Sequence, residues 1–300
     1  MFETIVVGVD GREGGRDALS LAGRLAGGSG ADLVAVRDLP LDYAGSPPSR
    51  GPSEEDAFKE VERDLAAAGL RARIRVLEDP SPARALHRVA EAQPADLIVV
   101  GSTRHSRPGR VFVGDHAAGT VHGAPCPVAV APRDFAACEW SGPTRIGVGF
   151  DGRPEARQAL DFAVGLARES GATIEVVSVV GPPVTDAGAH RDDPDWLEAA
   201  KAAATELLHA ATRDVDAEIS GRVVAGLAVE ELVELSAGVD LVVVGSRGWG
   251  PVRRILAGST SVGLMREAHC PVIVLPRGAA TGEPGEHEPR RSQIEATTGA

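Results

Sequence analysis

A glycine-framed segment in the C-terminal half of the chain has the residue types and spacing that suit phosphate groups. The segment reads G-x2-G-x9-G-S, and its members are Gly245, Gly248, Gly258, Ser259, Thr260 and Ser261. The first two glycines lack a Cβ, so the main chain can turn tightly and bring its N–H groups close to an anion. The closing glycine and the hydroxyl residues open a predicted helix, whose N-terminus favours a second phosphate. A phosphate chain could therefore lie between two cradles of main-chain amides.

Residues at two neighbouring strand ends extend this candidate site. In open α/β sheets, ligands gather at the carboxyl ends of the strands. The first predicted strand of this half ends at Phe150 and Asp151, and the second ends at Val179. The Asp151 carboxylate could accept a ribose hydroxyl or reach adenine or magnesium indirectly, and Val179 could form an apolar wall for the base. Alternatively, Asp151 caps the following helix, a role that is compatible with ligand binding.

Catalysis has no corresponding support. The chain contains neither the G-x4-G-K-[ST] loop that places a lysine on the β and γ phosphates nor the G-x-S-x-G turn that exposes a nucleophilic serine. The histidines show no paired ligand spacing, and Arg247, Arg253 and Arg254 are more typical of solvated side chains than of phosphate contacts. Holding a nucleotide without rapid turnover is the more economical interpretation.

The candidate site belongs to the second of two copies of one sequence pattern. IVVGVDG at residues 5–11 returns as IGVGFDG at 146–152, an offset of 141 residues. ADLIVVGS at 95–102 and CPVAVAP at 126–132 return as VDLVVVGS and CPVIVLP, each 144 residues later. Three anchors in the same order with nearly constant spacing indicate a tandem duplication.

Each copy alternates short β-branched runs with longer segments of helical period, as repeated βαβ units do. Strands of the second copy are predicted near 144–150, 173–179, 217–224, 240–245 and 271–275. A helix near 154–169 begins with Pro154 in its first turn and ends before Gly171. Runs such as LVVV have no polar alternation, so these strands should be covered on both faces. The predicted fold is α/β, with two tandem doubly wound five-stranded parallel sheets.

Composition narrows the class of protein. A length of 300 residues suits two domains, and a formal net charge of −12 argues against a general affinity for nucleic acid or anionic lipid. No apolar run is long enough to span a bilayer, and the first residues enter a strand pattern without a secretion signal. We therefore expect a cytoplasmic protein. Cys126 and Cys270 are expected to be small buried side chains.

Domain boundaries follow from the repeat and from local composition. Ser141-Gly142-Pro143 separates the copies, which predicts a first domain at 1–141 and a second at 142–277. Residues 278–300 have almost no aliphatic side chains and are predicted to be a disordered tail. Two loops rich in Pro and Gly are candidate mobile flaps: 40–53 and 181–194.

The G-x2-G-x9-G-[ST] spacing, the aspartate after the first strand and the CPV strand together resemble the universal stress protein family, in a tandem form that covers about residues 1–277. The resemblance implies Rossmann-like, adenine nucleotide alpha hydrolase-like domains with ATP, with or without magnesium, along the fourth-strand loop. It also implies that two such domains pair through their last strands, within the chain or in a homodimer. The nucleotide contacts that it implies are Phe150, Asp151, Val179, Gly245, Gly248, Gly258, Ser259, Thr260 and Ser261.

The first copy departs from the pattern at the positions that would face phosphate. Arg104 replaces the second glycine, Gly114 is followed by Asp115, and Asp38 stands where the second copy has Val179. A carboxylate about 4 Å from a phosphate charge costs about 4 kcal/mol at an effective dielectric of about 20, as an upper estimate. We expect the first site to be empty or to bind a different ligand. Four basic residues here could hold a simple anion, although a solvated loop is the commoner arrangement: Arg104, His105, Arg107 and Arg110.

The leading hypothesis is a regulatory protein of the universal stress type that binds an adenine nucleotide in its second domain. The ligand would alter the surface or the stability seen by an unknown protein partner. Two alternatives stay open: a slow ATPase or phosphotransfer enzyme that uses the same site, and an interaction scaffold that binds no nucleotide. Neither nucleic acid nor a membrane is an expected partner.

Overall fold

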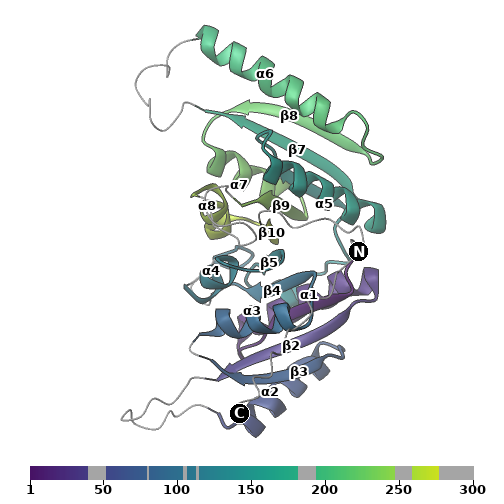
Figure 1. Cartoon of the computed structure of the whole chain (residues 1–300), viewed down its shortest axis with the longest axis vertical. Coiled ribbons are helices and arrows are strands. Elements are labelled where there is room, and N and C mark those ends of the chain that lie inside the picture. Colours follow the sequence, from purple (N-terminus) through teal and green to yellow (C-terminus); the bar gives the residue numbers. More distant parts are fainter. Residues whose placement is uncertain are drawn as a thin grey trace, which may run out of the picture.

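The chain forms two α/β halves that join along one sheet in the computed structural model (Figure 1). The structure describes residues 1–39, 52–79, 81–103, 107–112, 115–181, 194–246 and 259–276. The first half contains β1 (Thr4–Gly8), α1 (Glu13–Ser29), β2 (Asp32–Leu39), α2 (Glu54–Ala67), β3 (Arg73–Glu78), α3 (Pro82–Ala92), β4 (Leu97–Gly101), α4 (Asp115–Val121) and β5 (Val128–Ala131). After a 3-10 helix, η1 (Phe135–Ala137), the second half contains β6 (Arg145–Gly149), α5 (Pro154–Ser170), β7 (Thr173–Val180), α6 (Pro194–Thr212), β8 (Ile219–Ala225), α7 (Ala228–Gly238), β9 (Leu241–Gly245), α8 (Ser259–Glu267) and β10 (Val272–Leu275).

The strands make one ten-stranded sheet with the order β3-β2-β1-β4-β5-β10-β9-β6-β7-β8. Within each half all pairs are parallel, and the first strand lies between the second and the fourth, which is the doubly wound order. The predicted fold class is confirmed. The halves meet where β5 pairs antiparallel with β10, with Ala129 opposite Ile273. This is the last-strand pairing that the family resemblance implies, and it covers one sheet edge of each half.

Helices cover both faces of the sheet, as its unbroken apolar strands require. One core cluster lies under α1, α2, α5 and α6, and the other lies under α3, α4, α7 and α8. Leu241, Val242 and Val243 of β9 are fully buried. Helix α5 begins at Pro154 and is followed by Gly171, whose φ of 73° lies in the left-handed region. Both of these signals therefore mark the helix boundaries that the sequence predicts.

Side chains outside the sheet also join the halves. Phe2 packs against Phe162 of α5, with ring centroids 6.0 Å apart. The carboxylate of Asp17, buried on α1, accepts the amides of Asp134 and Ala136 at 3.0 and 2.8 Å, which fixes the start of the connection to the second half. Burial raises the pKa of Asp17, against the opposing effect of these two hydrogen bonds. The halves are thus held by packing as well as by strand pairing.

The cysteines that precede the last strand of each half are buried, as predicted. Cys126 is 7% exposed and Cys270 is 5% exposed, and both thiols are free. Burial raises the pKa of the Cys126 thiol to about 12, so it is un-ionised at neutral pH. These side chains therefore serve the core.

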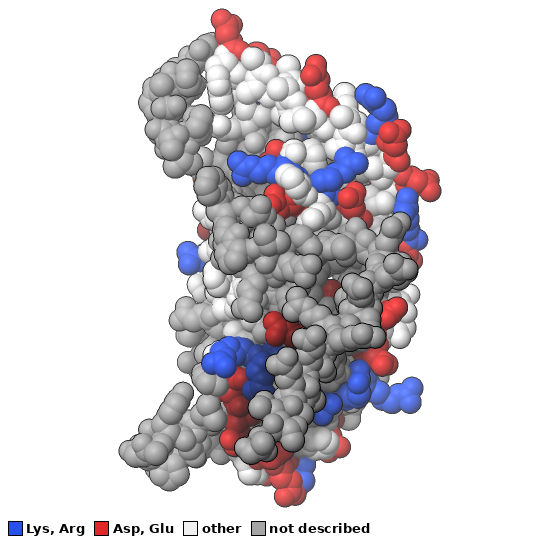
Figure 2. Space-filling model, in the orientation of Figure 1, with Lys and Arg blue, Asp and Glu red and all other residues white. Residues whose placement is uncertain are grey.

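The surface carries charges of both signs. On the face drawn in Figure 2, acidic and basic side chains of the described residues are interspersed. None of the helices that the structure describes is long and apolar enough to cross a bilayer. Most of the two predicted flaps and the whole predicted tail lie outside the described residues.

Candidate functional site

Three strand ends of the second half meet at the edge of the sheet where the sequence predicts a site. Because β6 pairs with both β7 and β9, the ends that carry Asp151, Val179 and Gly245 are neighbours. Gly245 ends β9, and a Cβ at this position would lie 2.5 Å from the carbonyl oxygen of Glu155 in the first turn of α5. The close approach that this glycine permits is therefore to a helix of the protein. It brings the start of α5 against the end of β9.

The closing serine of the predicted phosphate loop begins a helix, α8. Ser259 is exposed, Thr260 is half-buried and Ser261 is only 4% exposed. The first turn of a helix contains amides that the helix itself does not bond, and a phosphate site uses such amides. The other residues of the loop lie outside the described part of the chain, namely Gly248 and Gly258 with Arg247, Trp249, Arg253 and Arg254.

Asp151 is exposed at the end of β6 and organises the turn into α5. Its Oδ1 accepts the amide of Arg153 at 3.1 Å, and its Oδ2 lies 3.7 Å from the Arg153 Nε. Because Arg153 is the residue that precedes α5, this hydrogen bond shapes the turn before the helix rather than capping an amide of its first turn. Both side chains are more than half exposed, so the ion pair contributes little to stability. The carboxylate is held in place and stays accessible to a ligand.

Phe150 and Val179 lie on opposite faces of the sheet. Phe150 is 6% exposed and packs in the core cluster under α5 and α6. Val179 is half-buried and packs against the cluster under α7 and α8. Phe150 therefore offers the site its main chain rather than its ring, whereas the Val179 side chain lies on the face that carries α8.

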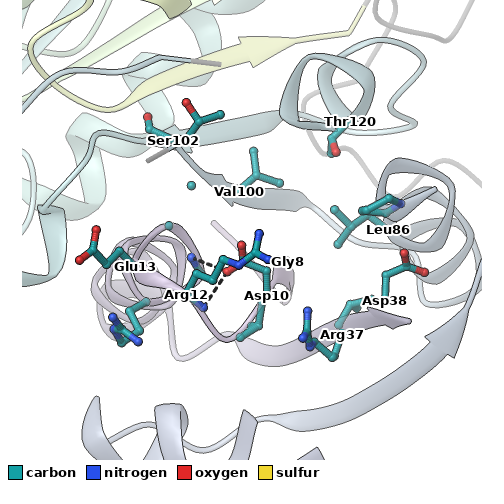
Figure 3. Close-up of a pocket in the computed structure, with 18 residues that line it drawn as sticks. Gly8, Asp10, Arg12, Glu13, Arg37, Asp38, Leu86, Val100, Ser102 and Thr120 are labelled. Atoms are coloured by element: carbon teal, nitrogen blue, oxygen red, sulfur yellow. Dashed lines mark hydrogen bonds between the residues drawn. The ribbon is translucent and has the colours of Figure 1, made fainter. Parts of the chain in front are cut away.

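In the first half, the counterparts of these residues line one hollow of about 700 Å³ (Figure 3). Its lining includes Val9, Asp10, Asp38 and Gly101, which correspond to Phe150, Asp151, Val179 and Gly245. A Cβ on Gly101 would overlap the carbonyl oxygen of Gly14 in α1, so this glycine has the packing role of its counterpart. The hollow lies where β1 separates β2 from β4, the usual ligand position in a doubly wound sheet.

Apolar side chains that no sequence motif indicates line the base of the hollow. In the first half, Leu86 and Val100 surround Gly8; in the second, Leu232 and Val244 surround Gly149. Each of these side chains has an atom between 3.1 and 3.6 Å from the place of a Cβ on its glycine. Both halves therefore keep an apolar surface that suits a flat base. The repeat offset is the sequence signal that could have identified it.

The carboxylates that follow the first strands are bonded differently in the two halves. Asp10 accepts the amide of Arg12 at 3.0 Å and that of Gly15, in the first turn of α1, at 3.2 Å (Figure 3). Among the hydrogen bonds described, Asp151 accepts only the Arg153 amide. The Asp151 carboxylate thus accepts fewer of the described hydrogen bonds than Asp10 does, which leaves more of its oxygen lone pairs for a ligand.

The serines after the fourth strands also differ. Ser102 Oγ donates to the Ala131 carbonyl at 2.7 Å and accepts the Phe112 amide at 3.1 Å, which ties the loop of the first half to two strand ends. Ser246 is 3% exposed, and its hydroxyl has no hydrogen-bond partner within the described part of the chain. Ser102 is therefore fully hydrogen-bonded within its own half, whereas the Ser246 hydroxyl has no such partner among the described residues. Beyond it, Asp115 begins α4 at the position that Ser259 has in α8, while Arg104 and Gly114 are not among the described residues.

An aspartate before each fourth strand is a structural residue that the motif search also passes over. Asp96 accepts the amides of Glu3 and Thr4 at 2.7 and 2.9 Å. Its counterpart Asp240 accepts two amides at the start of β6, both at 2.9 Å, and the hydroxyl of Thr144 at 2.6 Å. The ADL and VDL sequences of the repeat thus tie the first strand of each half to its fourth.

Comparisons with known proteins agree with the fold and the repeat. The profile of the universal stress protein family matches residues 1–132 and 143–276. Universal stress protein Rv2005c of Mycobacterium tuberculosis is 29% identical over 299 residues, which cover 90% of this chain and 96% of that protein. Universal stress protein Rv2319c of the same organism is 28% identical over 297 residues, which cover 91% and 99%. A solved universal stress protein from Archaeoglobus fulgidus matches the fold with a TM-score of 0.64 at 18% identity, covering 92% of this chain and 98% of that one.

Proposed function

Since the chain belongs to the universal stress protein family, we propose that it is a regulatory protein that binds ATP in the crevice of its second domain, residues 142–277. The observation that carries the proposal is the difference between two helix starts. Ser259 begins α8 behind an intact glycine pattern, whereas Asp115 begins α4. A helix N-terminus attracts phosphate through its free amides and its dipole, and a carboxylate at that place opposes the attraction.

The described residues fit the parts of an adenine nucleotide. The first turn of α8, from Ser259, supplies amides and hydroxyls for a phosphate. Asp151, ordered by its own turn and still exposed, suits a ribose hydroxyl. Val179, Leu232 and Val244 supply apolar surface for the base. Magnesium bound together with the nucleotide would take its oxygen ligands chiefly from the phosphates, with Asp151 as a candidate carboxylate.

The first domain, residues 1–141, has the hollow but lacks the second glycine and the closing serine that suit a phosphate. Asp38 lines it where the second domain has Val179, and Asp10 already accepts one amide of the turn before α1 and one amide of its first turn. We therefore assign nucleotide binding to the second domain alone. A ligand held there stabilises the folded state by about 2.7 kcal/mol at a concentration one hundred times its Kd. Such a change in stability or surface is what a protein partner would detect.

Isothermal titration calorimetry with ATP and magnesium tests both parts of the proposal. The expected stoichiometry is close to one nucleotide per chain. Two nucleotides per chain would contradict the assignment to one domain, and no binding of any adenine nucleotide would contradict the proposed function. Recovery of intact ATP after long incubation with the protein is expected for a regulatory role. Sustained phosphate release that is lost in a Gly258→Asp variant would instead favour an enzyme.

A further inference from the structure

The loop that follows β4 is anchored to its own half at both ends. Gly109 donates its amide to the Arg133 carbonyl, and Arg133 returns an amide to the Arg110 carbonyl, both at 3.0 Å. At the other end, the Thr103 amide donates to the Phe112 carbonyl at 3.1 Å. Residues 109–112 are therefore bonded to Arg133, just beyond the end of β5, and to Thr103 at the start of the loop.

Two of these residues, Arg110 and Val111, also contact the second half. Arg110 Nη1 donates to the carbonyl of Glu267, the last residue of α8, at 2.7 Å. The Val111 amide donates to the carbonyl of Ala268 at 2.8 Å, and both of these residues are fully buried in one core cluster. The C-terminal end of α8 thus receives two hydrogen-bond donors from the other copy. Carbonyls at a helix C-terminus lack partners within the helix, and a guanidinium there complements the negative end of the dipole.

His269, two residues after α8, is also in contact with Arg110. Arg110 Nη1 lies 3.4 Å from Nδ1 of His269, and the His269 amide donates to the hydroxyl of Ser236 on α7 at 3.0 Å. Ser236 is 1% exposed and donates to the Val233 carbonyl at 2.6 Å. The Arg110 side chain therefore lies at a half-buried junction of α7, α8 and the turn before β10.

We propose that Arg110, although it belongs to the loop that has lost the glycine pattern, is a positioning residue for nucleotide binding in the second domain. The inference rests on the proposed function. Helix α8 has nine residues and is about 13 Å long, with its phosphate-facing end at Ser259 and its anchored end at Glu267. Fixing one end of so short a helix also restricts the other end. The conformational entropy of Ser259 and its neighbours is then already reduced in the ligand-free protein, so binding loses less of it.

The proposal also explains what the first domain contributes. Its loop after β4 no longer suits phosphate, and the same loop supplies the donors that hold the phosphate-facing helix of the other domain. Occupancy of the second domain and the packing of the first should therefore be coupled. Coupling between two sites is reciprocal, so a nucleotide at α8 should in turn protect the loop around Arg110.

The test uses the full chain with Arg110→Ala, Arg110→Lys and a control, Arg168→Ala, which removes an exposed arginine from the last turn of α5. Calorimetry with ATP should show a five- to tenfold weaker Kd for Arg110→Ala, at the lower end of typical coupling energies. Arg110→Lys keeps a cationic donor and should recover most of the affinity, and Arg168→Ala should match the wild type. Hydrogen exchange in the ligand-free chain should accelerate at the amides of residues 263–268 in Arg110→Ala.

A spectroscopic readout reports the contact itself. Burial and the neighbouring Arg110 charge lower the pKa of His269, so in Arg110→Ala this pKa should move toward 6.5 in an NMR titration. Failure of the wild type to bind any adenine nucleotide would overturn the proposed function. Wild-type affinity in Arg110→Ala, or unchanged exchange along α8, would overturn the role of Arg110 while the proposed function stands.

Discussion

The two halves agree at the residues that build the sheet and differ at the residues that would meet a ligand. Gly101 and Gly245 each bring a strand end against a helix, and Asp96 and Asp240 each tie a fourth strand to a first. The replacements fall at positions that the sequence predicts to face a ligand: Arg104 for Gly248, Asp38 for Val179 and Asp115 for Ser259. The two copies therefore share the residues that build the sheet, and under the proposed function they differ in ligand chemistry. In the first half, the loop after β4 contacts α8 of the other half through Arg110.

The largest expected effect comes from placing a charge in the intact loop. Gly258→Asp puts a carboxylate at the mouth of α8, where two unit charges about 4 Å apart at an effective dielectric of about 20 repel by about 4 kcal/mol. Calorimetry should therefore show a loss of ATP affinity of up to about a thousandfold.

The matched change in the first half is Gly114→Asp, which should leave ATP affinity at the wild-type value. Arg104→Gly should likewise add no second site. Equal losses in Gly258→Asp and Gly114→Asp, or a gain of binding in Arg104→Gly, would remove the distinction between the halves.

The next effect in size concerns the two packing glycines. A Cβ on Gly101 would overlap the Gly14 carbonyl oxygen, and one on Gly245 would lie 2.5 Å from that of Glu155, so main chain must move in both cases. Forced overpacking costs about 1–3 kcal/mol. We expect a loss in the free energy of unfolding of about 3 kcal/mol for Gly101→Ala and about 2 kcal/mol for Gly245→Ala, measured by urea denaturation.

Gly28→Ala is the control for this pair. This glycine lies in α1 with no atom within 4 Å of the place of its Cβ. Alanine favours a helix over glycine by about 1 kcal/mol, so this variant should be as stable as the wild type or more so. A Gly101→Ala chain as stable as Gly28→Ala would show that the strand end and α1 are not closely packed.

A comparison of Gly171 with Gly245 shows which features of the fold the sequence predicts and which it does not. Pro154 and Gly171 mark the ends of α5 because their effect on the main chain is local, and the unbroken apolar strands predict a sheet covered on both faces. The neighbour of Gly245 is set by how α5 packs on β9, which no local pattern encodes. Arg110 reaches Glu267 only because β5 pairs with β10, so its contact was out of reach of a search within one copy.

A smaller effect is expected at the aspartates that tie the first strands. Asp96→Ala leaves two amides without their acceptor, and Asp240→Ala also removes the partner of the Thr144 hydroxyl. Hydrogen bonds to a charged group contribute about 1.5–3 kcal/mol when buried and less when exposed, so each variant should lose about 1–2 kcal/mol in the free energy of unfolding. Asp240→Ala should lose the more. Equal stability of Asp240→Ala and the wild type would contradict the role of this residue.

The smallest expected effect is on the pH dependence of the unfolding free energy, where Asp240 in the second half and Asp17 in the first should act in opposite directions. Burial acts to raise the pKa of Asp240, but hydrogen bonds from Thr144 and Arg145 outweigh it, so this pKa lies below 3.8 and the residue stabilises the fold above that pH. This contribution fades as the pH falls from 3.8 toward the folded-state pKa. Burial raises the pKa of Asp17, so the stability that Asp17 contributes is instead lost as the pH rises from 3.8 through the folded-state pKa.

Between pH 3 and pH 5, the rise in unfolding free energy should therefore become shallower in Asp240→Asn and steeper in Asp17→Asn, each by less than about 1 kcal/mol. Urea titrations at the two pH values measure both slopes, and a change of the same sign in the two variants would contradict this assignment.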